Sequence, residues 1–459
     1  MGQRRPMLDI TKEYLQQLNE CIDAGKDSEL RASLEELHAT DIAGVIDRLN
    51  FDHASYLFRL LDNEAKADVL IELDEEQRSD LLSAMTAEEI AEEVLENLDS
   101  DDAADVMGEL PETKAEEVIG LLEDEEQASD IRDLLNYEDG TAGALMAKEL
   151  VKVRGEWTVT RAIREIRRQA DELHQVYTVY VVDAEDRLTG RLSLKHLLLA
   201  AESTRSRISE LQSKGDIATI LAEEPEEKAT KLMERYDLVA LPVVDETGRL
   251  LGRITIDDAV DAIIEDAERD YQLASGISED VESSDSVWTL TRARLPWLLI
   301  GLVGGLGGAY VIGAFDIHEN AEMALFIPLI AAMGGNVGVQ SAAIVVQGLA
   351  ASNMATGNIL SRLSKELGVG LINGLICGIL ILGSSIVLGF GTALSITVSI
   401  ALICVIVFAA LFGTFVPLML DRYKIDPALA TGPFITTVND IIGLMIYFAV
   451  GGVIASYLI

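Results

Sequence analysis

The last third of the chain consists of apolar runs that are too long for the core of a soluble domain. Residues 295–315, 323–361 and 367–420 contain no charged residue at all. A helix that crosses a bilayer needs about 20 residues, so the longest of these runs has room for two, and GFGTALS at 389–395 interrupts it. A final run, 427–459, contains one carboxylate, Asp440. The sequence therefore predicts five transmembrane helices within residues 294–459.

Basic residues between these runs indicate the orientation. Arginines and lysines gather on the cytosolic side of membrane proteins. In the predicted topology all six basic residues after residue 290 lie on one side, whereas the loop FDIHENAE lies on the other. We therefore expect a multi-pass protein of the plasma (inner) membrane, with a cytosolic N-terminus and an outer C-terminus. Five helices are few for a pore, so a homodimer about a shared axis is expected. The basic residues are Arg292, Arg294, Arg362, Lys365, Arg422 and Lys424.

The region before the membrane runs is strongly acidic. The chain has 36 basic and 77 acidic residues and a net charge of −41, and only seven of the acidic residues follow residue 290. Such a surface repels nucleic acid and attracts cations, so no nucleic-acid partner is expected. A solvated acidic face would account for the charge equally well.

Residues 61–135 contain a repeat of short amphipathic segments. Six units begin at 61, 73, 85, 98, 110 and 122. Thr86 with Glu89 and Asp74 with Gln77 have the spacing of capping boxes. Helices this short cannot bury an apolar face alone, so we expect them to stack into an all-α superhelical N-terminal domain, residues 1–138. A docking scaffold would explain this repeat without further function.

A second repeat alternates strands and helices between residues 139 and 270. YVVDAEDRLTGRLSLKHLLLA at 180–200 matches LPVVDETGRLLGRITIDDAVDAI at 241–263. The pattern resembles a tandem pair of α/β CBS domains. Many such pairs bind adenine nucleotides, so ATP is a candidate ligand, although others are only structural. Residues 271–293 are then expected to form a connecting helix that leads to the first span.

Asp440 is the strongest candidate for a functional residue. A carboxylate within a membrane helix costs roughly 3 kcal/mol unless it faces water, a partner or an ion. It could serve only as a hydrogen bond between helices, but acidic residues at this depth commonly mark ion paths. Magnesium holds its waters tightly and is often bound through them by one or two carboxylates. A homodimer would bring two copies of Asp440 to one axis.

The segment IPLIAAMGGNVGVQSAAIV at 327–345 combines glycines with polar residues, among them Asn336. Small residues allow helices to approach closely, which would also explain the glycines by packing alone.

These motifs carry a family resemblance. GGNVGVQSA and IDPALATGPFITTVND, together with the helical repeat and the CBS pair, closely resemble the MgtE family of bacterial magnesium channels. The resemblance implies a homodimer with its pore on the two-fold axis, a pore carboxylate at Asp440, and an acid at the cytosolic mouth, Asp426. It also implies regulatory magnesium bound between the N-terminal domain, the CBS pair and the connecting helix, which closes the pore. One acid of that sensor is replaced here by Arg269. The matching sensor positions are Asp68, Asp101, Asp105, Asp237, Asp258, Asp261, Asp266 and Asp270.

The expected function is therefore uptake of Mg²⁺ through a channel that cytosolic Mg²⁺ closes. A transporter coupled to protons or sodium would also use an intramembrane carboxylate, and selectivity for another divalent ion such as cobalt or calcium stays open. Nothing in the sequence supports an enzyme, because it contains no nucleophile–base constellation, no zinc spacing and no phosphate-binding glycine loop followed by lysine.

Overall fold

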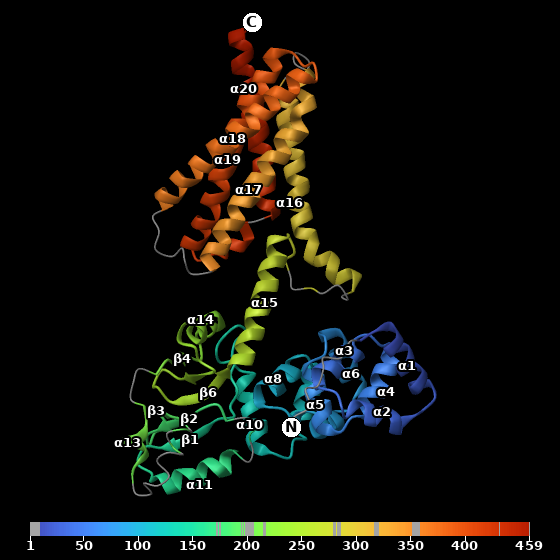
Figure 1. Cartoon of the computed structure of the whole chain (residues 1–459), viewed down its shortest axis with the longest axis vertical. Helices are drawn as coiled ribbons and strands as arrows, with labels where there is room; N and C mark the ends of the chain where they lie inside the picture. The colour runs from blue at the N-terminus through green and yellow to red at the C-terminus, as the bar shows by residue number, and fades with distance from the viewer. Residues whose placement is uncertain are drawn as a thin grey trace. The chain divides into compact units, whose positions relative to one another are not determined.

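The structure of the chain is a computed structural model (Figure 1). It describes residues 10–170, 173, 176–193, 195, 197, 206–213, 217–278, 281, 286–315, 321–350, 359–430 and 432–458. The chain forms two compact units, Met1–Ile264 and Glu265–Ile459, and each is described by itself.

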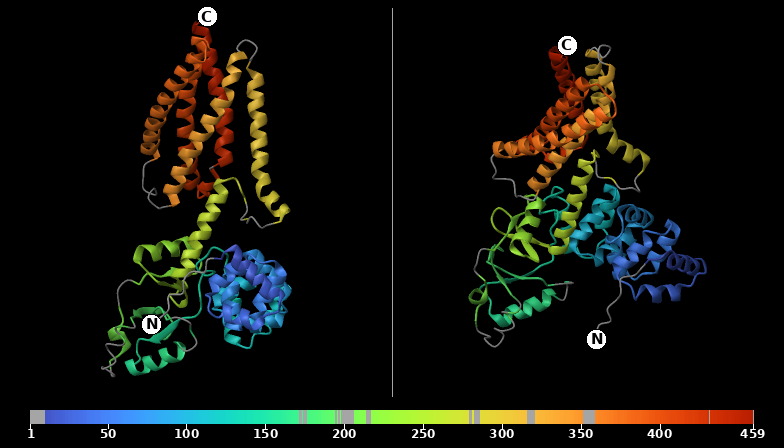
Figure 2. Two further views of the ribbon diagram at one scale, coloured as in Figure 1. Left: turned by 45° about the vertical axis from the view of Figure 1, so that its right-hand side comes forward. Right: turned by 45° about the horizontal axis from the view of Figure 1, so that its top comes forward.

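The first unit begins with ten short α-helices that coil about a common axis (Figure 2). Each predicted repeat unit contributes one helix, from α5 to α10, so the repeat and its superhelical stacking are confirmed. Ile90, Leu95 and Ile131 are fully buried in the shared core. The helices are α1 (Lys12–Asp23), α2 (Asp27–Leu34), α3 (Ala39–Ile46), α4 (Phe51–Leu60), α5 (Asn63–Ile71), α6 (Glu75–Ala84), α7 (Ala87–Glu93), α8 (Ser100–Gly108), α9 (Glu112–Ile119) and α10 (Glu125–Leu134), with a 3₁₀ turn η1 (Leu95–Asn97) after α7.

Of the two predicted capping boxes, one forms. At α7 the N–H of Glu89 donates to Thr86 Oγ1 at 3.2 Å, and the N–H of Thr86 donates to the Glu89 carboxylate at 2.8 Å. The box predicted for Asp74 and Gln77 is wrong, because the Asp74 side chain makes no cap hydrogen bond. The N–H of Asp74 donates instead to Asp47 Oδ1 at 3.4 Å, so the residue that caps the end of α3 takes the place of Gln77.

The duplicated α/β region follows, as predicted. Each half has a three-stranded sheet in which the first strand is parallel to the second and the second is antiparallel to the third. The two hairpin turns pair with each other, since Leu188 N donates to Gly248 O and Leu250 N donates to Asp186 O, both at 3.0 Å. The elements are β1 (Val151–Arg154), α11 (Val159–Ala170), β2 (Val179–Val182), β3 (Leu188–Leu192), α13 (Ile208–Leu211), β4 (Ile220–Leu221), α14 (Glu226–Tyr236), β5 (Ala240–Val244), β6 (Leu250–Thr255) and α15 (Ile256–Ala274).

The helix that leaves the second CBS unit lies earlier in the chain than the predicted connecting helix, 271–293. It is α15, which ends at Ala274, and the described residues from Gly276 to Ser286 are not helical. Gly276 adopts φ +81°. Gly276 N donates to Leu273 O and Ile277 N to Gln272 O, which is the Schellman arrangement that terminates a helix. The prediction overlooked this glycine stop signal.

The second unit contains five helices that are long and apolar enough to cross a membrane, within the part of the chain that the structure describes. The predicted number is therefore confirmed. The predicted break at 389–395 begins between α18 (Ile359–Val387) and α19 (Thr392–Arg422), where Gly389 has φ +86°, but its last four residues belong to α19. Arg362 and Lys365 lie in the first turns of α18, not in a preceding loop. The elements are α16 (Val287–Ala314), η3 (Ala321–Phe326), α17 (Ile327–Ala350), α18 (Ile359–Val387), α19 (Thr392–Arg422), η4 (Pro427–Ala430) and α20 (Gly432–Leu458).

The capping contacts give a test of the superhelix. Thr86→Ala removes one helix cap and should lower the free energy of unfolding by about 1 kcal/mol. Asp74→Ala is the matched control, because its side chain caps nothing and its N–H remains, so a smaller loss is expected. Thermal unfolding of the purified full chain measures both, and equal losses would contradict the assignment of the caps.

Candidate functional site

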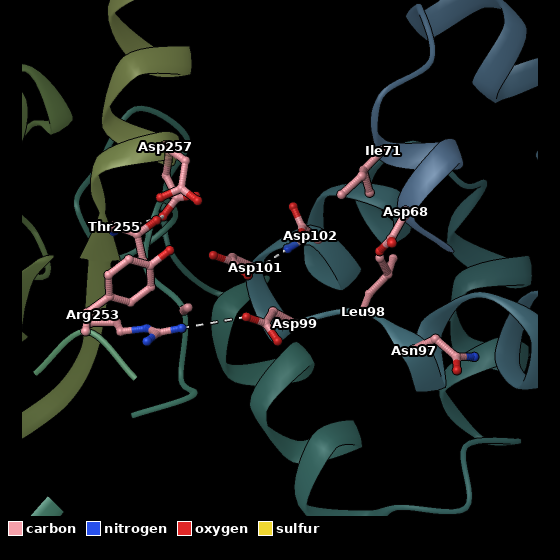
Figure 3. Close-up of a pocket in the computed structure, with 13 residues that line it drawn as sticks. Asp68, Ile71, Asn97, Leu98, Asp99, Asp101, Asp102, Arg253, Thr255 and Asp257 are labelled. Atoms are coloured by element: carbon pink, nitrogen blue, oxygen red, sulfur yellow. Dashed lines mark hydrogen bonds and ion pairs between the residues drawn. The ribbon is translucent and has the colours of Figure 1, made fainter. Parts of the chain in front are cut away.

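An acidic cavity of about 190 Å³ lies in the first unit, between helix α8 with its neighbours and the second CBS unit (Figure 3). In Figure 3, Asp99, Asp101 and Asp102 extend from the start of α8, Asp68 from α5, and Asp257 from the start of α15 on the opposite wall. The cavity is lined by Asp68, Ile71, Asn97, Leu98, Asp99, Asp101, Asp102, Ala147, Tyr177, Arg253, Thr255, Asp257 and Asp258.

The start of α8 is fixed by a residue from far along the chain. Asp99, at the N-cap, makes no side-chain cap hydrogen bond. Instead Glu149 accepts from the N–H of Ser100 at 3.0 Å and from its hydroxyl at 2.8 Å. Ser100 is fully buried, and its Oγ also accepts from the N–H of Lys148. The segment entering the CBS pair therefore holds the aspartates of α8 in place.

The opposite wall is fixed by a second capping contact. Asp258 accepts from both the N–H and the hydroxyl of Thr255, at 2.9 and 2.5 Å, where β6 passes into α15. Arg253 on β6 is buried, and its Nη2 lies 3.7 Å from Asp99 Oδ2. This arginine is the one cationic group among the cavity-lining residues, which include six aspartates.

The environment disfavours ionised carboxylates. Burial, followed by repulsion from Asp102, Asp258 and Glu149, raises the pKa of Asp101 well above its ordinary value. Burial and the surrounding acids, Asp258 first, raise the pKa of Asp102 to about 7. Burial likewise raises the pKa of Asp258, despite its hydrogen bonds from Thr255. A cation in the cavity would relieve this repulsion.

The spacing of the acidic side chains bears on whether the cavity suits a bare or a hydrated cation. Among the residues that the structure describes, no three acidic, histidine or cysteine side chains converge closely enough to hold a bare metal ion. Oxygen ligands suit Mg²⁺ and Ca²⁺, and Mg²⁺ usually keeps several of its waters. The aspartates that line the cavity are the groups that could hold such a hydrated ion through its waters.

The predicted sensor residues do not all meet here. Asp68, Asp101 and Asp258 line the cavity, but Asp105 and Asp261 do not. Asp105 contributes to the raised pKa of Asp102, and burial followed by Asp257 raises the pKa of Asp261.

Three of the predicted sensor residues lie elsewhere. Asp237 caps the C-terminus of α14 in a left-handed conformation, φ +50°. Asp266 and Asp270 lie on the part of α15 that belongs to the second unit.

The prediction missed several cavity residues and one supporting residue. Asp102 is adjacent to Asp101 in the run DSDDAAD, and Asp257 is adjacent to Asp258, so paired aspartates could have indicated them. No sequence signal marks Glu149, because its role depends on a contact with Ser100, 49 residues earlier.

In the second unit, Asp440 lies half-buried on α20 beside the glycine-rich face of α17. A Cβ atom added to Gly335 would lie 3.8 Å from Asp440 Oδ1. One added to Gly338 would collide with Nδ2 of Asn439. Asn439 is 1% exposed, and its side-chain atoms have no hydrogen-bond partner among the described residues. The glycines of α17 thus make room for the polar pair Asn439 and Asp440.

The remaining predicted pore residues are less closely associated. Asn336 follows Gly335 on α17 and is exposed in the single chain. Asp426 is exposed and accepts from the N–H of Ala428 at 2.8 Å, so it caps η4, and no described hydrogen bond or ion pair joins it to Asp440. The prediction also missed Glu366 on α18, whose carboxylate accepts from the hydroxyl of Ser341 on α17 at 2.6 Å.

Known proteins match the chain along most of its length. The family model described as a divalent cation transporter matches residues 327–450. The model of the MgtE intracellular N domain matches residues 37–140, and the CBS-domain model matches 142–203 and 208–265.

Individual relatives agree with these models. The magnesium transporter MgtE of Thermus thermophilus is 32% identical over 94% of this chain and 96% of its own length. That of Enterococcus faecalis is 34% identical over 72% of each chain. The crystal structure of the cytosolic domain of the Mg²⁺ channel MgtE in complex with ATP is 33% identical, with a TM-score of 0.50, over 54% of this chain and 99% of that one.

These relatives are named for magnesium transport, and the family models match the N domain, the CBS domains and the transporter domain in that order along this chain. The resemblance, the multidomain membrane fold and the non-enzymatic class are confirmed, and the chain belongs to the MgtE family of magnesium transporters.

Proposed function

We propose that the protein is a homodimeric Mg²⁺ channel of the plasma membrane, which Mg²⁺ bound in the cytosolic acidic cavity closes. The observation that carries the proposal is the cavity itself, where six aspartates share one arginine and where burial and repulsion from neighbouring acids raise the pKa of Asp101, Asp102 and Asp258. A divalent cation stabilises the compact arrangement of these walls, and its loss favours their separation.

The proposal divides the chain into four parts. Residues 1–138 form the helical domain, 139–270 the CBS pair, 271–293 the connecting segment and 294–459 the pore domain. The N-terminus is cytosolic and the C-terminus is outside. The six basic residues near the spans support this orientation through the positive-inside rule.

In the pore, Asp440 provides the ion site. Two copies about a two-fold axis place two carboxylates around one hydrated Mg²⁺ and balance its charge. Asn336 and Asp426 would contribute polar groups along the path, and the glycines of α17 leave space beside Asp440. A monovalent ion would compensate less charge at the same site.

The sensor would include the cavity residues Asp68, Asp101 and Asp258 together with Asp105, Asp237, Asp261, Asp266 and Asp270. A response to cytosolic Mg²⁺ in the millimolar range requires several weak sites, and the closing ion must bind the compact state better than the open one.

ATP is proposed as a ligand of the CBS pair. The support is the relative whose cytosolic domain was crystallised with ATP. In this chain the paired hairpin turns bring Arg187 and Arg249 side by side as bridge partners, which offers two cations for a polyphosphate.

The pore assignment predicts the effect of replacing Asp440. Asp440→Ala should reduce Mg²⁺ flux into liposomes at least tenfold, because the ion loses its charged partner. Asp421→Ala is the control, since that carboxylate is exposed in the last turn of α19 and outside the proposed path, and it should retain the parent's flux. Unchanged flux for Asp440→Ala would remove the pore assignment.

The same liposomes separate a channel from a coupled transporter. For a channel, collapse of a proton or sodium gradient at constant membrane potential leaves Mg²⁺ flux unchanged. Flux that follows either gradient would favour the coupled alternative, in which Asp440 exchanges the coupling ion.

The sensor assignment predicts that the double variant Asp101→Asn/Asp258→Asn will weaken closure. Internal Mg²⁺ that closes the parent channel should leave this variant substantially open in patch recordings. Asp52→Asn/Asp80→Asn is the matched control, because both carboxylates are exposed and lie outside the cavity and the proposed sensor, so it should retain the parent's inhibition. Unaltered inhibition in the double variant would contradict the sensor.

The raised pKa of Asp102 predicts a pH dependence. A carboxyl group whose pKa is higher in the folded state stabilises the fold at low pH, and this contribution is lost as pH rises towards about 7. Without Mg²⁺, the chain should therefore unfold at a lower temperature at pH 8 than at pH 5, and Asp102→Asn should raise the pH 8 midpoint by about 4 °C. Mg²⁺ should stabilise the parent more at pH 8 than at pH 5. Equal Mg²⁺ effects at both pH values would contradict this account.

A further inference from the structure

An apolar groove of about 530 Å³ lies between α18 and α19. Phe408 and Phe412 stack within it, with ring centroids 5.6 Å apart, and Phe415 is 42% exposed at its wall. Ser364 is the single residue with a polar side chain in the lining, and its hydroxyl donates to Ser361 O on its own helix. The groove is lined by Leu360, Leu363, Ser364, Leu367, Phe408, Leu411, Phe412 and Phe415.

The face of α19 that lines the groove extends beyond it to a basic residue, Arg422. Phe408, Phe412, Phe415, Met419 and Arg422 follow the spacing of one helix face. Phe415 lies about 10 Å along the helix from Phe408, and Arg422 lies about 10 Å further. Arg422 is exposed and ends the helix.

The length of α19 places these residues at different depths. Its 31 residues span about 46 Å, which exceeds the roughly 30 Å hydrocarbon layer. The phenylalanines therefore lie in one half of the hydrocarbon layer, and Arg422 reaches the headgroup region on the same side. In the topology of the proposed function, on which this step rests, that side is cytosolic.

We propose that this groove binds one anionic phospholipid of the cytosolic leaflet, with an acyl chain between α18 and α19 and its phosphate at Arg422. The lining offers an acyl chain apolar contacts along its length, and Arg422 provides the complementary charge.

A second copy of the chain fits this groove less well. Two copies in one membrane share their orientation, so a two-fold contact centred on the groove would place each Arg422 at the same depth as its symmetry mate. The two like charges would repel each other.

The experiment is native mass spectrometry of the full chain in detergent, titrated with phosphatidylglycerol or with phosphatidylcholine of the same acyl chains. Phosphatidylglycerol should bind more tightly to the parent. Arg422→Gln should weaken its binding about fivefold, the effect of about 1 kcal/mol for one basic residue near a lipid headgroup. Lys365→Gln is the matched control. Lys365 is exposed in the same α18 segment, but helical geometry places it roughly opposite the groove-lining face, so less than twofold weakening is expected.

The groove itself is tested by filling it. Ser364→Phe should abolish binding of both lipids, whereas Ser361→Phe, outside the lining, should not. Equal effects of Arg422→Gln and Lys365→Gln, or unchanged binding by Ser364→Phe, would overturn the proposal.

A cross-linking measurement tests whether a second copy of the chain occupies the groove. In a chain whose Cys21, Cys377 and Cys404 are replaced by serine, Phe415→Cys should form no disulfide-linked dimer under oxidation in membranes. A disulfide-linked dimer would instead identify the groove as an interface between copies. Asp440→Ala should bind lipid as the parent does, so failure of the lipid site is distinguishable from failure of the proposed ion path.

Discussion

Asp101, Asp102 and Asp258 line one cavity, where burial and repulsion from neighbouring acids raise the pKa of each. Native folds normally separate such groups or pair them with cations. Here two capping contacts, Glu149 with Ser100 and Asp258 with Thr255, hold the aspartates in place on opposite walls. The free energy of this arrangement therefore depends on what neutralises it, a proton or a cation. That dependence is what a sensor of divalent ions requires.

In the membrane unit, a single carboxylate is likewise held in place without a basic partner on its own helix. Asp440 is the single acid within its apolar run, and the surrounding helix supplies no basic residue. Two glycines of α17, Gly335 and Gly338, have no side chain and so leave room for Asp440 and Asn439. Close helix approach and an intramembrane carboxylate thus occur at the same place. In the proposed function, carboxylates in the two units would respond to the same ion.

Much of the architecture could be predicted because it rests on local patterns. The six repeat helices follow from apolar spacing and their starting residues, the duplicated CBS unit follows from two matching segments, and the five spans follow from uncharged length. The connecting helix was misplaced because Gly276 ends α15 through a local glycine signal that the prediction overlooked. The Asp74 cap failed for a different reason, since Asp47, 27 residues earlier, already accepts its N–H.

The sequence by itself determined the family and the membrane character, and it singled out Asp440 as a candidate, because each of these depends on residue type and on spacing along the chain. Only the tertiary structure decided which of the many acidic residues share a cavity. It brought Asp102 and Asp257 to Asp101 and Asp258, placed Asp237 elsewhere, and assigned Glu149 its supporting role. In a region this acidic, composition cannot distinguish a carboxylate in water from one held against its neighbours. That distinction arises from burial and from contacts between residues far apart in the chain.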